Sequence, residues 1–313
     1  MSAVAPEWMD GAPRALERLL GTLEAPVRSQ LRGLLDEVRA DDDWVLSGFV
    51  AGRATTPLLA LCDALREDEG LAPGRAALRP VGEAALFLYL SLRAQEAMAR
   101  RGPDGRGAVG PIGVEVIDAL AGAAAGALAR TGGDAAALMH LRENALYRYA
   151  TAATAELHDY QHGFAPPNPR RAGELYLPMA LVPAAVALQG GRTKLDGIAE
   201  MMVAFGAAEQ LAHQLLHAAE DYAAGRRTPV LDALGARGKL DPKKRRVRVL
   251  DLLISDPALD EMRATAAHLY DEARRAAEGA ADAATIAAIR SRIRCLDDIP
   301  NRLMSLAFGL HVS

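Results

Sequence analysis

Residues 205–221 read FGAAEQLAHQLLHAAED, and this stretch decides the fold class. Small and apolar residues recur along it at the spacing of a helix. Glu209, His213 and His217 follow one another at intervals of four residues, which predicts that their side chains share one helical face. The stretch therefore predicts a long helix that carries carboxylate and imidazole groups together.

The composition of the whole chain also favours helices. Half of the 313 residues are hydrophobic and only 4% are aromatic, whereas a β-sandwich would need more aromatic and β-branched residues. The net charge of −4 provides no field that would attract nucleic acid or an anionic membrane. Two distant cysteines without metal-ligand spacing suggest a reduced, cytoplasmic protein. No signal peptide is recognisable, and the longest apolar run, residues 175–188, is too short and proline-broken for an integral membrane segment.

Helical patterns follow one another along the chain, separated by joints rich in glycine and proline. No linker is long enough to divide the chain, so we predict a single all-α domain over residues 1–313, with accessory helices in residues 1–40. The predicted helices cover residues 12–22, 24–39, 43–66, 79–99, 111–131, 134–162, 171–189, 194–222, 228–235, 243–254, 256–278 and 282–311.

Two acidic runs are predicted to be structural rather than metal-binding. Asp41, Asp42 and Asp43 precede Trp44 and an apolar helix, where carboxylates can satisfy free backbone amides and the helix dipole. The pair at positions 297 and 298 is predicted to form a turn.

The stretch that begins at residue 205 resembles the second aspartate-rich helix of the trans-isoprenyl diphosphate synthases. That helix reads FQxxDDxxD and is followed by GKxTxP. Gln210 matches the glutamine, and Arg226 and Thr228 match the downstream signature. The three aspartates are replaced in this chain by His213, Gln214 and His217.

Further segments between residues 45 and 240 resemble the family in the same order. Arg53 lies in a segment similar to GGKxxRP, whose basic residues bind diphosphate in the family. Gln95 and Glu96 occupy the places of the aspartate pair in the first aspartate-rich helix. Arg171 stands for the lysine of a KTxxL segment.

The resemblance implies an isoprenoid-synthase-like helical bundle around a central cavity. In the family, two aspartate clusters hold magnesium ions that bind an allylic diphosphate. Magnesium prefers hard oxygen ligands and rarely accepts imidazole, so we do not expect a standard magnesium cluster in this chain. An isoprenyl diphosphate head group is expected to meet arginines at the positions that the family keeps basic. These are Arg53, Arg171, Arg226 and Arg227.

Four of the seven histidines occur as two pairs with a spacing of four residues, which is how one helix gives a metal ion two nitrogen ligands. The resemblance places the two helices across the cavity from each other. One hypothesis is therefore a site for zinc, iron or manganese. Its ligands would be His158, His162, His213 and His217, with Glu209 or Glu96. A metal-free polar cavity and histidines without a functional role are the alternatives.

Three functional classes follow from the resemblance. The first is an enzyme that binds an isoprenyl diphosphate or an isoprenoid-derived ligand and carries out non-standard prenyl transfer or cyclisation. The residues expected nearest the chemistry are Glu96, Glu209, Gln210 and Gln214. The second class is a catalytically silent partner subunit of an active prenyl synthase, and the third is a repurposed histidine-rich metalloenzyme. The expected assembly is a homodimer or a heteromer with a prenyl synthase.

Overall fold

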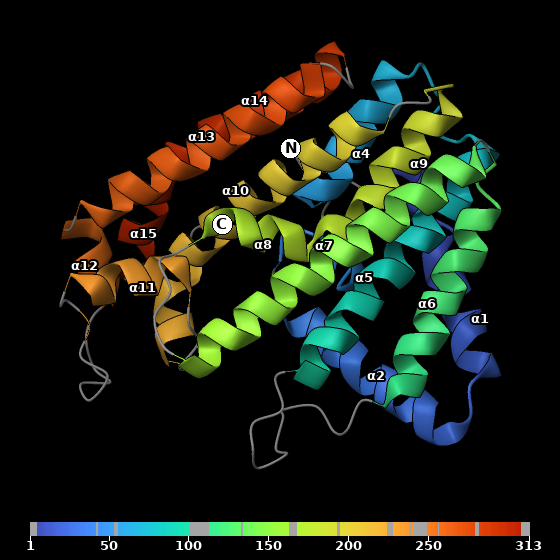
Figure 1. Cartoon of the computed structure of the whole chain (residues 1–313), viewed down its shortest axis with the longest axis horizontal. Coiled ribbons are helices and arrows are strands. Elements are labelled where there is room, and N and C mark those ends of the chain that lie inside the picture. The colour runs from blue at the N-terminus through green and yellow to red at the C-terminus, as the bar shows by residue number, and fades with distance from the viewer. Residues whose placement is uncertain are drawn as a thin grey trace. The chain divides into compact units, whose positions relative to one another are not determined.

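A computed structural model describes residues 5–41, 43–52, 56–99, 113–132, 134–162, 168–192, 195–223, 228–237, 240, 249–255, 257–278 and 282–307. Within these residues every regular element is a helix, which confirms the predicted all-α class (Figure 1).

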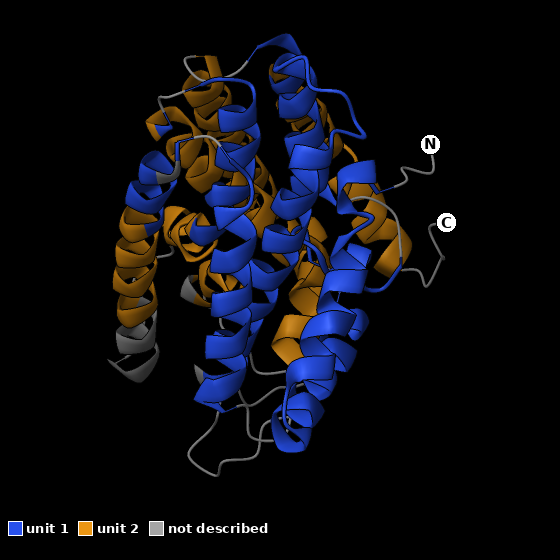
Figure 2. Cartoon of the chain, turned by 90° about the vertical axis from the view of Figure 1, so that its right-hand side faces the viewer, with its two compact units in different colours: residues 1–142, 178–195, 282–285 blue, residues 143–177, 196–281, 286–313 orange. Residues whose placement is uncertain are grey.

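The chain forms two compact units, coloured blue and orange in Figure 2. Unit 1 comprises residues 1–142, 178–195 and 282–285, and unit 2 comprises residues 143–177, 196–281 and 286–313. Each unit is assembled from segments that are far apart in the sequence. Neither unit is one continuous stretch of chain. The prediction of a single domain stays a prediction.

The core of unit 1 is built around helix α5. Its helices are α1 (Ala12–Thr22), α2 (Ala25–Ala40), α3 (Ser47–Val50), α4 (Pro57–Asp68), α5 (Arg79–Ala99), α6 (Val114–Ala129) and α9 (Leu181–Gln189), with the short 3-10 turns η1 (Glu7–Met9) and η2 (Ala76–Leu78). Helix α5 packs against α1, α2, α6 and α9. Leu86, Phe87 and Leu92 are buried on different sides of it, as expected for a helix that is apolar around most of its circumference.

The core of unit 2 is built around helix α10 (Asp196–Ala223). The helix packs against α8, α11, α12, α13 and α15. The bounds of these elements are α8 (Pro169–Leu175), α11 (Pro229–Ala236), α12 (Val249–Ser255), α13 (Ala258–Glu278) and α15 (Ile299–Ala307). Two further helices begin in unit 1 and end in unit 2, α7 (Ala135–His162) and α14 (Ala283–Leu296), and the turn η3 (Leu177–Ala180) lies at a boundary between the units.

Three predicted helices are each broken in the structure. The helix expected over residues 43–66 stops at Gly52, whose φ of 70° is left-handed, and restarts at Pro57 behind the N-cap residue Thr56. The helix expected over 171–189 is interrupted at Tyr176, ahead of a proline that has no backbone N–H.

The third break confirms a prediction about the acidic run. The helix expected over 282–311 is divided at residues 297 and 298, where the sequence had predicted a turn.

Asp43 satisfies backbone amides of the turn that leads into α3, the structural role predicted for this acidic run. Its Oδ1 accepts hydrogen bonds from the backbone N–H groups of Val45, Leu46 and Ser47 at 2.8, 3.1 and 3.2 Å. Its Oδ2 accepts a hydrogen bond from the hydroxyl of Tyr89 on α5. The carboxylate therefore fixes the start of α3 against the central helix of unit 1.

No helix in the described ranges is long and apolar enough to cross a membrane by itself. Only the pair Pro169–Leu175 and Leu177–Gln189, taken together across a bend, meets that test of length and composition.

Helices α8 and α10 approach each other closely at Gly173. A Cβ atom at this position would lie 1.9 Å from the carbonyl oxygen of Val203 and 3.1 Å from the backbone nitrogen of Ala207. Both obstacles are backbone atoms, which cannot rotate away. The two helices can therefore pack this closely only because residue 173 has no side chain.

We expect Gly173→Ala to lower the free energy of unfolding by about 1–3 kcal/mol, because the added methyl forces the helices apart. The control is Gly122→Ala on the exposed face of α6, where nothing lies within 4 Å of the added atom. That variant should be unchanged or more stable by up to about 1 kcal/mol. Urea unfolding followed by circular dichroism measures both, and equal stabilities would contradict the close approach.

The first turn of α14 is capped by Asp68, which ends α4. The Asp68 carboxylate accepts hydrogen bonds from the backbone N–H groups of Asp282, Ala284 and Thr285 at 3.1, 2.7 and 2.8 Å. Burial acts to raise the pKa of Asp68, but the hydrogen bonds outweigh it and the net pKa lies below the ordinary value of 3.8. The stabilisation is therefore present above pH 3.8 and is lost as the pH falls through the lower pKa of the folded state.

We expect Asp68→Asn to cost about 1 kcal/mol at pH 7, the usual loss when a helix cap is weakened. The difference from the parent chain should shrink at acid pH, because the parent then loses the same charge. Thermal unfolding between pH 7 and pH 3 gives this dependence. Asp118→Asn, on the exposed face of α6, is the control and should show no such convergence.

Candidate functional site

Four polar residues of the segment that resembles the second aspartate-rich helix form one stripe along α10. Gln210, His213 and His217 are half-buried and Gln214 is 7% exposed. Their spacing of three and four residues places them on adjoining turns of the same helix. The structure thus keeps the imidazole and amide groups of this segment together on one helix.

The two imidazoles of this stripe stack on each other. The ring centroids of His213 and His217 are 4.2 Å apart, with 29° between the ring planes. The Nδ1 of His217 lies 2.7 Å from Oε2 of Glu220, one turn further along α10. A carboxylate only accepts hydrogen bonds, so Nδ1 of His217 carries the proton of this contact.

Gln214 contributes a buried amide oxygen to the same stripe. Within the described part of the chain, its Oε1 is buried and has no hydrogen-bond partner. Leaving a buried acceptor unpaired costs about 1–3 kcal/mol, so such an atom marks a place where a further donor or cation would be stabilising.

Glu209 is directed into the core of unit 2. It is 2% exposed, and its two carboxylate oxygens accept hydrogen bonds from Nε and Nη2 of Arg292 on α14, at 2.6 and 2.8 Å. Burial acts to lower the pKa of Arg292, but the adjacent Glu209 carboxylate outweighs it and the net pKa of the guanidinium is raised. The carboxylate predicted to join the imidazoles is instead paired with an arginine, in an ion pair whose acid is buried and whose arginine side chain is 32% exposed.

Tyr270 on α13 completes the surroundings of this pair. Its ring meets Phe205 of α10 edge to face, with ring centroids 5.8 Å apart. Burial, and then the negative charge of Glu209, raise the pKa of the Tyr270 phenol well above its ordinary value. The phenol therefore stays protonated beside the ion pair of Glu209 and Arg292.

Glu96, the other candidate carboxylate, is also held by an arginine. Arg93 on α5 is 7% exposed and donates to Oε2 of Glu96 at 3.0 Å and to Oδ2 of Asp41 at 2.5 Å. The neighbouring Gln95 amide donates to the Ser91 hydroxyl at 3.4 Å. In unit 1, as in unit 2, a guanidinium neutralises the carboxylate that the sequence singled out.

These donor groups do not fit a magnesium cluster. The predicted site offers imidazole and amide groups, and the carboxylates of Glu96 and Glu209 are each paired with an arginine. Among the described side chains, no three from His, Cys, Asp and Glu come together as a group that could hold a metal ion. The described side chains therefore provide no cluster of carboxylates of the kind that magnesium prefers.

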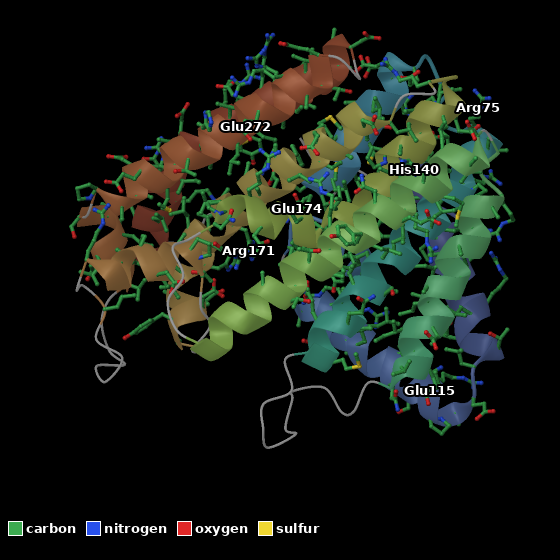
Figure 3. All side chains as sticks on the ribbon, viewed as in Figure 1. Arg75, Glu115, His140, Arg171, Glu174 and Glu272 are labelled. Atoms are coloured by element: carbon green, nitrogen blue, oxygen red, sulfur yellow. The ribbon has the colours of Figure 1, made fainter. Side chains whose placement is uncertain are left out.

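Arg171 is the one predicted head-group residue that the structure describes. It lies in the first turn of α8, as Figure 3 shows together with Glu174 on the same helix. Arg148 of α7 donates to Glu174 at 2.6 and 2.8 Å and to Glu200 of α10 at 2.7 Å, which fixes α8 in unit 2. Hydrogen bonding to Glu174 is the largest cause of the raised pKa of Arg148.

For several other predicted site residues, the position or the side chain lies outside what the structure describes. Arg53, Arg226 and Arg227 lie outside the described residues. His158 and His162 belong to the last turns of α7, but their side chains are not described. The four-histidine hypothesis therefore stays a prediction.

The sequence analysis missed Arg93 and Arg292. Arg93 follows the apolar run LFLYLSL at positions 86–92, and a lone arginine beside such a run signals a buried ion pair. Its partner Glu96 at i+3 was readable from the sequence, whereas Asp41 was not. For Arg292 no local signal existed, because its partner Glu209 is 83 residues away.

We expect Arg292→Leu to lower the free energy of unfolding by about 3 kcal/mol, because it leaves the Glu209 carboxylate buried without its cation. Adding Glu209→Leu should recover much of that loss by removing the orphaned charge. Arg39→Leu is the control, since Arg39 and its partner Asp36 are 53% and 76% exposed and such surface pairs contribute less than about 1 kcal/mol. A double variant no more stable than Arg292→Leu would contradict this account.

Comparisons with known proteins identify the fold. No family model matches the sequence, and no curated protein matches it significantly. The structure is similar to geranylgeranyl pyrophosphate synthetase from the archaeon Geoglobus acetivorans, with a TM-score of 0.66, 12% identity, and coverage of 96% of this chain and 99% of that chain.

Two bacterial structures are also similar over nearly their whole length. Polyprenyl synthase from Caulobacter crescentus, complexed with calcium and isoprenyl diphosphate, has a TM-score of 0.56 and 17% identity, covering 97% of this chain and 98% of that one. Geranylgeranyl pyrophosphate synthase from Corynebacterium glutamicum has a TM-score of 0.57 and 15% identity, covering 95% and 98%. The chain therefore has the all-α fold of the trans-isoprenyl diphosphate synthases, as the sequence predicts.

Proposed function

We propose that this protein binds an isoprenyl diphosphate, or a small molecule derived from one, without a magnesium cluster. The fold likeness supports the ligand class, since the similar Caulobacter polyprenyl synthase was solved with isoprenyl diphosphate and calcium. The observation that carries the proposal is the donor set on α10, where Gln210, His213, Gln214 and His217 stand at the motif positions.

Replacing aspartates with amides changes side chains that only accept hydrogen bonds into side chains that also donate them. Aspartates only accept hydrogen bonds and repel a diphosphate unless metal ions lie between them. Amide N–H and arginine groups donate, so they can bind phosphate oxygens directly. Gln210 is half-buried on the stripe, and Arg171 is provided by α8, which packs on α10. Head-group binding by Arg171 and the stripe amides accordingly needs no magnesium.

The same donor set gives little support to ionisation of an allylic diphosphate. A departing diphosphate needs its developing charge neutralised in the transition state, which magnesium does efficiently. Here Glu96 and Glu209 are already held by Arg93 and Arg292 at 3.0 Å or less. The protein therefore acts as a binding protein of this ligand class rather than as a magnesium-dependent synthase.

A second function, the catalytically silent partner of an active prenyl synthase, is favoured by one specific observation. Glu96 and Glu209 are each paired with an arginine. Such pairs stabilise the fold whether or not the chain catalyses a reaction, so a chain selected for its fold alone would retain them. Mixing the protein with an active synthase and measuring product chain length separates the two functions, since only a partner subunit shifts the product.

We expect geranyl, farnesyl or geranylgeranyl diphosphate to bind the full chain in the presence of EDTA. Calorimetry should give an affinity that added magnesium changes by less than about threefold. Arg171→Ala should weaken binding by roughly tenfold, the effect of removing one charge-assisted hydrogen bond.

The matched control is Arg275→Ala, which removes an exposed arginine of α13 and should leave the affinity unchanged. Binding that appears only with magnesium, or equal losses in the two variants, would contradict the proposal. Pyrophosphate release in EDTA would instead reveal non-standard prenyl transfer or cyclisation.

A further inference from the structure

We propose that Gln214 selects a ligand whose head group donates a hydrogen bond, and that this ligand is an isoprenyl alcohol. The isoprenoid chain of the ligand is taken from the proposed function, on which this assignment rests, whereas the head group is assigned from Gln214. Hydrolysis of an isoprenyl diphosphate by water yields such an alcohol together with inorganic pyrophosphate. The alcohol is therefore a small molecule derived from an isoprenyl diphosphate.

The amide of Gln214 holds a hydrogen-bond acceptor that still lacks a donor. The residue is 7% exposed, its Oε1 is buried, and among the described residues this oxygen has no hydrogen-bond partner. Buried polar atoms are almost always paired, and an unpaired one lowers the stability of the protein. A ligand that brings an O–H group to this oxygen therefore forms a hydrogen bond without displacing any donor of the described protein.

A small molecule can approach this oxygen along the stripe on α10. Gln210 precedes Gln214 by four residues and His217 follows it by three, so both flank it on one face of the helix. Both are half-buried, and the side chain of His217 is 28% exposed. Gln214 thus lies at the buried edge of a face that solvent partly reaches.

The next buried polar residue on this face also carries acceptor oxygens. Asp221 lies seven residues after Gln214, which is two helical turns, and it is 5% exposed. Acceptor oxygens disfavour a deprotonated diphosphate, whose oxygens only accept hydrogen bonds as well. An alcohol donates one hydrogen bond and also accepts, so its O–H can bind Gln214 while its lone pairs receive an N–H group such as that of Gln210. A diphosphate consequently depends on Arg171, whereas an alcohol depends on Gln214.

The full chain in EDTA is tested with geraniol, geranyl methyl ether and geranyl diphosphate. The ether keeps the oxygen and the carbon chain of geraniol, but a methyl group replaces the hydrogen that geraniol donates. The parent protein should bind geraniol at least about tenfold more tightly than the ether, because the ether leaves the acceptor of Gln214 unpaired. Calorimetry measures both affinities.

Gln214→Met keeps the length of the side chain and removes its acceptor. This variant should reduce the preference for geraniol over the ether to less than about twofold. It should also raise the urea midpoint of unfolding of the ligand-free protein, because an unpaired buried acceptor is removed.

The matched control is Gln30→Met on α2. The Oε1 of Gln30 accepts a hydrogen bond from the backbone N–H of Gly113 at 2.8 Å, so this glutamine already has its donor. The same substitution should therefore lower the urea midpoint, and it should leave the preference for geraniol unchanged.

Several results would each overturn the proposal. Geraniol that does not bind, or that binds the parent protein no better than the ether, shows that no donor is selected. A preference that survives in Gln214→Met shows that the added methyl group is rejected for its bulk. A urea midpoint that Gln214→Met leaves unchanged or lowers shows that the oxygen is already satisfied in the free protein.

The comparison of geraniol with its ether in the parent protein needs no variant, so it decides the proposal even if Gln214→Met does not fold. Binding of geranyl diphosphate in EDTA is the separate readout of the proposed function. If the diphosphate binds while geraniol and its ether bind alike, the head-group assignment alone fails. If neither the diphosphate nor geraniol binds, the proposed function fails with it.

Discussion

Two ion pairs, each between an arginine and a carboxylate, hold the charged side chains inside the two units. Glu209 and Arg292 satisfy each other inside unit 2, and Glu96 and Arg93 do so inside unit 1. Both acids thereby lose the role that acids have in magnesium sites. The permanent positive charge of the guanidinium supplies internally what a bound ion would otherwise supply.

Helix α10 contributes side chains both to the core of unit 2 and to the half-buried stripe. Residues four apart on a helix advance by about 40° around its axis, so Glu209 and His217 diverge by about twice that angle. Glu209 consequently reaches the core and Arg292, while His213 and His217 remain half-buried on the stripe. Two residues four apart on a helix are neighbours on one face. In a series of three such residues, the first and the last are far enough apart around the axis to differ in burial.

The sequence predicted the fold because its signals are local and repeated. The long helix α10 was expected over residues 194–222 and covers 196–223, since its apolar pattern is continuous. The breaks at Gly52 and Tyr176 were not predicted, because the apolar helical pattern continues on both sides of each residue. The partners of the charged residues could not be predicted, because Arg93 finds Asp41 at a separation of 52 residues, and that choice belongs to tertiary packing.

The cap on α14 has a consequence for the order in which the chain folds. Asp68 and the backbone N–H of Asp282 are 214 residues apart in sequence, so the helix start receives its acceptor only from a segment synthesised long before. Chains emerging from the ribosome acquire structure from the N-terminal end first. The start of α14 therefore receives its capping acceptor from a segment that is synthesised earlier, and in a nascent chain truncated before residue 282 the Asp68 carboxylate has none of these backbone N–H groups to accept from.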